Sequence, residues 1–179
     1  MHIRTEREED YSQIYEVVKK AFEKAEHSDG NEQDLVEKLR KNKAYINSLS
    51  LVCEDNDKIV GYVMFTKNKI GKVTGLTLAP LAILPKYQHR RLGTLLVKSG
   101  LKIAKELGYE YVVVLGNPKY YNRFGFVTSK EFGIKSPFDV PSKNFMALNL
   151  IDNDDREDLN SVLEFRVLYK SIQIFSIMM

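Results

Sequence analysis

Hydrophobic residues recur at helical spacing in two segments of the N-terminal part of the chain. Between Asp10 and Glu26 they fall at steps of three and four residues, with lysines and glutamates between them, which predicts an amphipathic helix. After a polar break at residues 27–30, Asn31 is a candidate N-cap, and a second apolar stripe runs to Lys41. We therefore expect two helices separated by a short polar loop.

The next part of the chain has the pattern of strands. Two runs rich in Val, Ile, Tyr and Phe, 50–54 and 58–67, flank the turn residues 55–57, which predicts an antiparallel hairpin. The apolar run 74–84 predicts a third strand, but Pro80 in its middle has no N–H to donate to a neighbouring strand. We expect this strand to splay or bulge there and to expose backbone groups to a ligand.

Helices and short strands alternate in the remainder. The predicted elements are a helix at 93–107 ended by Gly108, a buried strand at 111–115, a brief helix opened by Pro118 and ended before Gly125, and strands at 126–127 and 145–150. This order predicts an α+β (mixed α/β) fold in which helices flank one sheet. No repeat or linker divides residues 1–150, so we assign them to one domain.

Residues 151–179 form an extension with a different pattern. An acidic connector at 151–160 precedes Leu163, Phe165 and Val167, which alternate with charged residues and predict one more strand. The apolar end of the chain would expose a large hydrophobic surface on a free appendage. We expect the extension to pack on the same domain, with strand pairing between two copies in a homodimer as the alternative.

Composition excludes several classes of protein. The 179 residues are 44% hydrophobic and 28% charged, as in ordinary globular domains, and the net charge of +3 is too small to favour a nucleic-acid partner. Cys53 is the single cysteine, so disulfides within the chain and multi-cysteine zinc sites are excluded, and we expect no metal and a buried, inert thiol. The charged N-terminus and the absence of any apolar stretch near 20 residues indicate a cytoplasmic protein without membrane partners.

The segment 81–96, LAILPKYQHRRLGTLL, carries the clearest candidate chemistry. An apolar strand is followed there by a basic loop and the start of a helix, whose first amides point outwards with partial positive charge. Lys86, Arg90 and Arg91 add formal charge around those amides. The junction is therefore a candidate phosphate-binding site, although a solvated basic turn has the same pattern.

Three ordered segments resemble the GNAT acetyltransferase superfamily. YQHRRLGTLLV, residues 87–97, is similar to its acyl-coenzyme A (CoA) signature: Gln88 and Gly93 match, and Arg91 stands where the first glycine belongs. Together with PLAILPKYQ, the later segments VVLGNPKYYNRFGF and SPFDVPSKNFMALNL closely resemble the YhbS-like branch, and the resemblance covers roughly residues 1–150.

The resemblance implies the GNAT fold, a twisted and mostly antiparallel sheet whose splayed fourth and fifth strands admit the pantetheine arm of acetyl-CoA. It implies that the loop holds the pyrophosphate and that the preceding strand offers backbone partners to the pantetheine. The implied cofactor-binding residues are Ala82, Ile83, Leu84, Gln88, His89, Arg90, Arg91, Leu92, Gly93, Thr94 and Asn117. Arg91 resists backbone dihedrals that glycine accepts, which weakens CoA binding unless its guanidinium forks onto phosphate instead.

The resemblance also implies a general acid. The tyrosine four residues before Gly125 is Tyr121, whose phenol would protonate the leaving thiolate, while Tyr120 packs or lines the pocket. The splayed strand has no Asp, Glu or His, so the base that deprotonates the amine comes from elsewhere. Glu32 is our candidate, although a glutamate at a helix start is also explained by the helix dipole. His27 and Glu54 are weaker candidates.

The expected function is an N-acetyltransferase that moves acetyl from acetyl-CoA to a primary amine of a small molecule or a protein, by direct attack of the amine through a tetrahedral intermediate. The main alternative is a CoA-binding sensor or structural module that retains the fold without turnover. A nucleic-acid-binding domain that uses residues 86–91 lacks interleaved aromatic residues beyond Tyr87.

Overall fold

A computed structural model describes residues 1–25, 28, 30–70, 73–137, 139–151 and 165–166. Its strands are β1 (His2–Thr5), β2 (Ser50–Asp55), β3 (Lys58–Ile70), β4 (Val73–Ile83), β5 (Tyr111–Leu115), β6 (Val127–Thr128), β7 (Phe145–Asn149) and β8 (Phe165–Arg166). They form one sheet in the order β1-β2-β3-β4-β5-β7-β6, and β8 pairs with β3 off this path. Neighbouring strands are antiparallel except β4 and β5, which run parallel. The mixed α/β architecture predicted from the sequence is confirmed.

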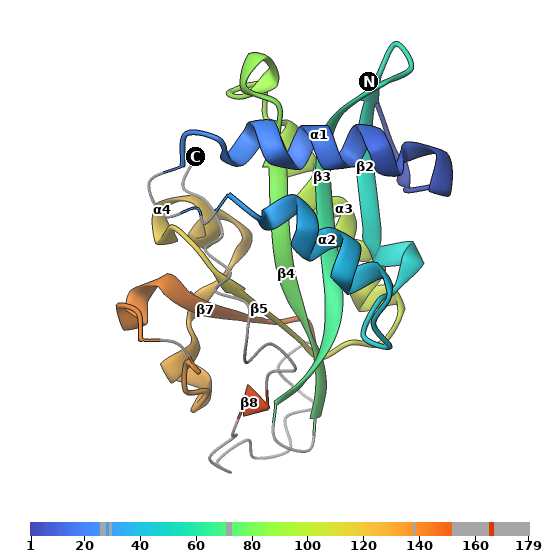
Figure 1. Ribbon diagram of the computed structural model, residues 1–179. Coiled ribbons are helices and arrows are strands. Elements are labelled where there is room, and N and C mark those ends of the chain that lie inside the picture. Colours follow the sequence, from blue (N-terminus) through green and yellow to red (C-terminus); the bar gives the residue numbers. More distant parts are fainter. Residues whose placement is uncertain (26–27, 29, 71–72, 138, 152–164, 167–179) are drawn as a thin grey trace.

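Helices cover both faces of this sheet. Figure 1 shows α1 (Tyr11–Phe22) and α2 (Glu32–Arg40) in front of the sheet and α3 (Leu92–Glu106) behind it. The short helix α4 (Pro118–Tyr121) follows β5. Each long helix buries its apolar stripe: Val17 and Phe22 of α1 pack in one core layer, and Leu96 and Val97 of α3 pack in the other. The periodic apolar positions thus place the sheet between two hydrophobic layers.

The β4 and β5 strands separate soon after they meet. They pair only at Leu76 with Val112 and at Thr77 with Val113, whereas β4 pairs with β3 along its whole length. On that β3 side the register shifts where Ala79 and Pro80 stand opposite a single residue, which is the bulge expected at Pro80. The second half of β4 therefore has β3 on one side and, among the described residues, no paired strand on the other.

Local turn chemistry follows the sequence closely. Asn56 and Asp57 both have positive φ, 49° and 58°, in the two-residue turn between β2 and β3. Gly108, with φ 78°, follows the end of α3. Asn31 stands at the N-cap of α2, but its side chain makes no capping hydrogen bond, so the prediction is right in position and wrong in that contact.

Three elements differ from the expectation. The strand β1 was not predicted, and it pairs with β2 at the edge of the sheet. The first helix ends at Phe22 instead of continuing towards Glu26, which lies outside the described residues. The strand predicted at 126–127 lies one residue later, at Val127–Thr128.

The extension is described at Ile151 and at Phe165–Arg166, where β8 runs antiparallel to the end of β3. The other tail residues on which the predicted packing rests, including Leu163 and Val167, lie outside the described part, so that packing stays a prediction.

Cys53 is buried as expected, and burial raises the pKa of its thiol. None of the helices in the described ranges is long and apolar enough to cross a membrane.

Candidate active site

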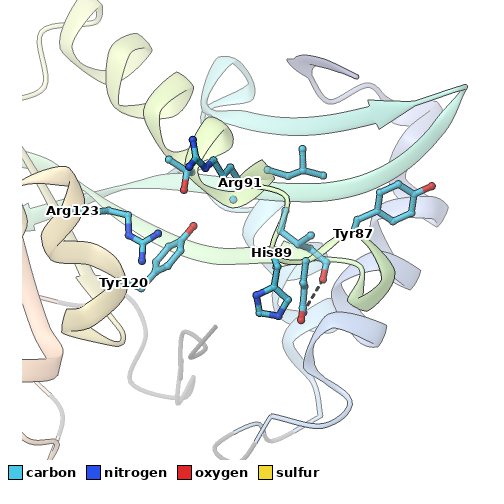
Figure 2. Close-up of a pocket in the computed structure, with 10 residues that line it drawn as sticks. Tyr87, His89, Arg91, Tyr120 and Arg123 are labelled. Atoms are coloured by element: carbon cyan, nitrogen blue, oxygen red, sulfur yellow. Dashed lines mark hydrogen bonds between the residues drawn. The ribbon is translucent and has the colours of Figure 1, made fainter.

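A cavity of about 270 Å³ lies between the carboxyl end of β4, the loop that follows it, the start of α3 and the segment after β5. Figure 2 shows the side chains around it. The lining residues are Ile83, Tyr87, Gln88, His89, Arg91, Leu92, Gly93, Thr94, Tyr120 and Arg123. The cavity thus coincides with the strand-loop-helix junction that the sequence marks as a phosphate site.

The loop reaches α3 through two residues with left-handed backbone. His89 and Arg91 both have φ 62°, a conformation that costs a non-glycine residue roughly 1 kcal/mol. Arg91 is also the N-cap of α3, with ψ 11°. The position at which the resemblance expects glycine therefore has a backbone that glycine would adopt without strain.

Backbone amides at the start of α3 face the same region. The Leu95 N–H donates to the carbonyl of the N-cap residue Arg91 at 3.0 Å, and this is the first hydrogen bond of α3. An α-helix leaves the amides before that point, here those of Leu92 to Thr94, without intrahelical acceptors. On the other side of the loop, Gln88 Nε2 donates to the Ile83 carbonyl at 3.3 Å and ties the loop to the end of β4. Free amides at the N-terminus of a helix favour anions, so the start of α3 is a candidate anion-binding site.

The charge of the cavity is one-sided. Arg91 and Arg123 line it, and the lining residues contain no Asp or Glu. Within the described ranges, no carboxylate lies at ion-pair distance from either arginine. These guanidinium groups are therefore available to an anionic ligand.

Tyr120 adds a buried hydroxyl to the wall opposite the loop. The residue is 7% exposed, and its hydroxyl oxygen has no hydrogen bond of good geometry in the described structure. Burial raises the pKa of Tyr120 above the ordinary tyrosine value, and the neighbouring Thr94 side chain offsets only part of the rise. Tyr120 therefore stays a neutral hydrogen-bond donor at physiological pH.

Comparisons with known proteins agree with this geometry. The model of the Acetyltransferase (GNAT) family matches residues 11–126. The chain belongs to the GNAT acetyltransferase family. An uncharacterized N-acetyltransferase of Escherichia coli K12, YjhQ, is 32% identical over 140 residues, which cover 75% of each protein.

Two solved GNAT structures are similar over most of the chain. A GNAT family acetyltransferase from Brucella melitensis in complex with acetyl-CoA has a TM-score of 0.69 and 31% identity, covering 83% of this chain and 86% of that one. YhbS from Escherichia coli in complex with CoA has a TM-score of 0.77 and 29% identity, covering 92% of this chain and 88% of that one. The resemblance to the GNAT superfamily and its YhbS-like branch is confirmed.

The structure gathers most, but not all, of the predicted CoA residues of this GNAT domain. Seven of them line the cavity: Ile83, Gln88, His89, Arg91, Leu92, Gly93 and Thr94. Arg90 lies outside that wall with its guanidinium 5.2 Å from the centre of the Tyr87 ring. Ala82 and Leu84 flank Ile83 without lining the cavity, and the Asn117 side chain accepts a hydrogen bond from the Lys119 N–H at 3.0 Å as the cap of α4.

The adjacent residues Tyr120 and Tyr121 have different surroundings. Tyr121 is fully buried and does not line the cavity, whereas Tyr120 does. The Tyr121 ring packs edge-on to Phe126 and covers Gly116, where a Cβ would collide with it. Because Gly116 directly follows β5, Tyr121 stands at the end of one of the two splayed strands. Its role as general acid stays a prediction.

The candidate bases have different environments. Glu32, the first residue of α2, is 6% exposed, and its Oε2 has no hydrogen-bond partner in the described structure. Glu54 accepts a 2.6 Å hydrogen bond from Arg4 Nε and forms an ion pair with it, which argues against the suggestion that it is a base. His27 lies outside the described residues. The described residues contain no group of three or more His, Cys, Asp and Glu suited to a metal.

Sequence reasoning missed two residues of the cavity. Tyr87 and Arg123 were not predicted as CoA contacts, although both line it. Arg123 belongs to the NRFGF segment, where its charge stands alone between aromatic residues. This isolated charge near Tyr120 in the sequence was the signal that could have pointed to Arg123 as a cavity residue.

Proposed function

We propose that this protein is an acetyl-CoA-dependent N-acetyltransferase that acetylates a primary amine of a small molecule or a protein by direct transfer. The observation that carries the proposal is the cavity at the mouth of the splayed β4 and β5 strands, lined by arginines that have no carboxylate partner among the described residues. The acetyl-CoA and CoA bound by the Brucella melitensis and Escherichia coli relatives support the same ligand.

The residues present fit acetyl-CoA. Unbonded amides at the start of α3 and the Arg91 guanidinium would hold the pyrophosphate, because both favour anions. The edge of β4 that has no paired strand among the described residues ends at Ala82 and Ile83 and would hydrogen-bond the pantetheine amides. Leu84 lies just beyond β4, and its N–H already donates to the Val60 carbonyl at 2.9 Å, which makes it the weakest of the three expected contacts. When bound, acetyl-CoA supplies a thioester carbonyl that an amine can attack.

Tyr121 is the proposed general acid. The amine nitrogen would add to the thioester carbon before the carbon–sulfur bond breaks, and the departing sulfur would take a proton from the phenol. The position of the Tyr121 ring beside Gly116, at the end of β5, supports this role. The phenol regains its proton from solvent after the products leave.

Glu32 is the proposed base. The attacking amine must be neutral, and an amine of the lysine type has a pKa of about 10.4. A buried carboxylate with one oxygen that lacks a partner is suited to accept the amine proton, directly or through water. Its place on α2 puts it on the face of the sheet opposite α3.

The alternative is a CoA-binding module with weak or no turnover. The observation in its favour is that no residue lining the cavity is a carboxylate that could serve as a base. Such a module would bind acetyl-CoA as tightly as the enzyme does and release no free thiol in the presence of amines.

The test measures acetyl-CoA binding by calorimetry and thiol release with a panel of primary amines. We expect Tyr121→Phe to lower kcat by about 100-fold with unchanged CoA affinity, because a leaving-group acid acts in the transition state. Tyr109→Phe, a partly buried tyrosine outside the cavity, is the matched control. We expect the loss caused by Glu32→Gln to shrink as the pH rises towards the amine pKa, because the amine then deprotonates unaided.

The outcomes separate the alternatives. Binding without thiol release by the wild type for any amine favours the binding module. Absence of binding at millimolar acetyl-CoA overturns both. An unchanged kcat in Tyr121→Phe, where chemistry limits the rate, removes that residue from the mechanism, and a pH-independent loss in Glu32→Gln indicates amine positioning instead.

A further inference from the structure

The cavity has cationic groups on two separate walls. Arg91 comes from the loop before α3, whereas Arg123 comes from the segment after α4. Figure 2 shows Arg123 and Tyr120 on one side of the cavity and Arg91 on the other. An anion bound to the loop alone would not contact the second wall. The positive charge of Arg123 on that wall therefore requires another explanation.

Arg123 is held in place by neighbours that leave its charge unneutralised. Its guanidinium carbon lies 4.6 Å from the centre of the Tyr120 ring, in cation–π contact. Its Nη2 donates to the Lys119 carbonyl at 3.4 Å, the end of the distance range for a hydrogen bond. No carboxylate of the described residues pairs with it. The side chain is thus positioned at the cavity with most of its five donors uncommitted.

Tyr120 presents a second uncommitted donor from the same wall. A buried hydroxyl without a good hydrogen bond costs roughly 1–3 kcal/mol, which a ligand that supplies an acceptor would recover. In Figure 2 the hydroxyl end of Tyr120 points towards the side of the cavity that carries Arg91. Thr94, from the first turn of α3, is its polar neighbour.

We propose that Arg123 and Tyr120 form the second arm of a clamp on the CoA pyrophosphate, opposite the loop 88–94. This inference rests on the proposed function, since the ligand is acetyl-CoA. The pyrophosphate is favoured over the 3′-phosphate because Tyr120 adjoins Thr94, beside the helix amides that bind an anion. In this arrangement Arg123 rests on the Tyr120 ring until the ligand arrives, and both residues then donate to the same phosphate group.

The test removes one arm of the clamp and shortens the ligand in steps. Arg123→Gln and Tyr120→Phe are titrated with acetyl-CoA, with its 3′-dephospho form and with S-acetylpantetheine, the last followed by NMR at millimolar ligand. We expect Arg123→Gln to weaken the first two ligands equally, by about tenfold, and to leave S-acetylpantetheine unchanged. Tyr120→Phe should show the same pattern with a smaller loss. Lys119→Gln is the charge-matched control, because Lys119 is an exposed cation of α4 that does not line the cavity, and it should change none of the three affinities.

Three results would overturn the clamp. A loss restricted to acetyl-CoA would assign Arg123 to the 3′-phosphate, and an equal loss for S-acetylpantetheine or a lower melting temperature of the free variant would make its role structural. Unchanged affinities would remove both residues from the site. Failure of the wild type to bind acetyl-CoA would instead refute the proposed function, so the two failures are distinguishable.

Discussion

Two pairs of arginines in this molecule differ in the side chains that surround them. Arg4 and Arg40, on the N-terminal side of the fold, are surrounded by carboxylates: Arg40 donates to Glu6 at 2.7 Å, and Arg4 donates to Asp10 at 2.6 Å. Arg91 and Arg123, at the cavity, have no carboxylate partner in the described structure.

We infer from this difference that the first pair of arginines stabilises the fold and that the second pair binds a ligand. The Arg40 side chain is 5% exposed, and its guanidinium carbon lies 3.8 Å from the centre of the Tyr11 ring. It pairs with Glu6, which also accepts a hydrogen bond from the Tyr45 hydroxyl. At the cavity, the unpaired cations accompany left-handed backbone at Arg91 and an unsatisfied hydroxyl at Tyr120. Such local costs persist at binding sites because a ligand repays them.

Removing Arg40 should give the largest effect on stability. Arg40→Met leaves the buried Glu6 carboxylate without its cation, and breaking a buried pair in this way costs about 3–5 kcal/mol. Chemical denaturation should show this loss in the free energy of unfolding, whereas the affinity of the folded protein for acetyl-CoA should be unchanged.

The control for this prediction is an exposed pair. Lys20→Ala breaks the Lys20–Glu16 contact of 3.6 Å and should cost no more than about 0.5 kcal/mol. Adding Glu6→Gln to Arg40→Met should recover part of the loss, because the orphaned charge is removed. A loss below 1 kcal/mol in the single variant would show that the paired cluster contributes little.

Replacing Arg91 should change binding and stability in opposite directions. Arg91→Gly removes the left-handed strain and should raise the free energy of unfolding by about 0.5–1 kcal/mol. It should also weaken acetyl-CoA by about tenfold, because a guanidinium that can reach phosphate is lost. Calorimetry and denaturant titration measure the two effects separately.

Asp57→Gly separates these effects, since Asp57 has φ 58° in the β2–β3 turn and does not line the cavity. We expect a similar or smaller gain in stability and no change in affinity. Tighter binding by Arg91→Gly would show that close approach of the backbone, and not the guanidinium, governs phosphate binding.

The smallest expected effect is the pH-dependent contribution of Asp10 to the stability of the fold. The hydrogen bond from Arg4 lowers the pKa of Asp10 below its ordinary value, so this pair stabilises the fold above the unfolded pKa of about 3.9 and loses that contribution as the pH falls further. Asp10→Asn should cost about 1 kcal/mol at pH 7, because the amide still accepts hydrogen bonds. The difference between the two proteins should close as the pH falls below about 4 in denaturant titrations. A difference that is independent of pH would rule out the ion pair as its source.

Much of the fold could be predicted because its signals are periodic or local. The apolar stripe of α1, the turn at Asn56 and the bulge at Pro80 each follow from residue types at fixed spacing. The edge strand β1 escaped prediction because it has four residues and one aliphatic side chain, Ile3, which is too little for an alternating pattern.

The site was harder to predict because it depends on side-chain direction. The proposed CoA loop could be located from Gln88, Gly93 and the basic residues between them, which resemble the GNAT signature. By contrast, α4 has only four residues, so its pattern cannot tell which of Tyr120 and Tyr121 faces the cavity, and tertiary packing decides it. Arg123 joins the site through its contact with Tyr120, which no spacing rule encodes.

The most direct test of this account is the salt dependence of acetyl-CoA affinity, measured by calorimetry on the full chain. If unpaired arginines bind the phosphates, the wild type should bind acetyl-CoA, and its affinity should fall steadily as the salt concentration rises. The double variant Arg91→Gln with Arg123→Gln should bind more weakly and with a shallower dependence on salt. Binding that is independent of salt and unchanged in the double variant would contradict the account.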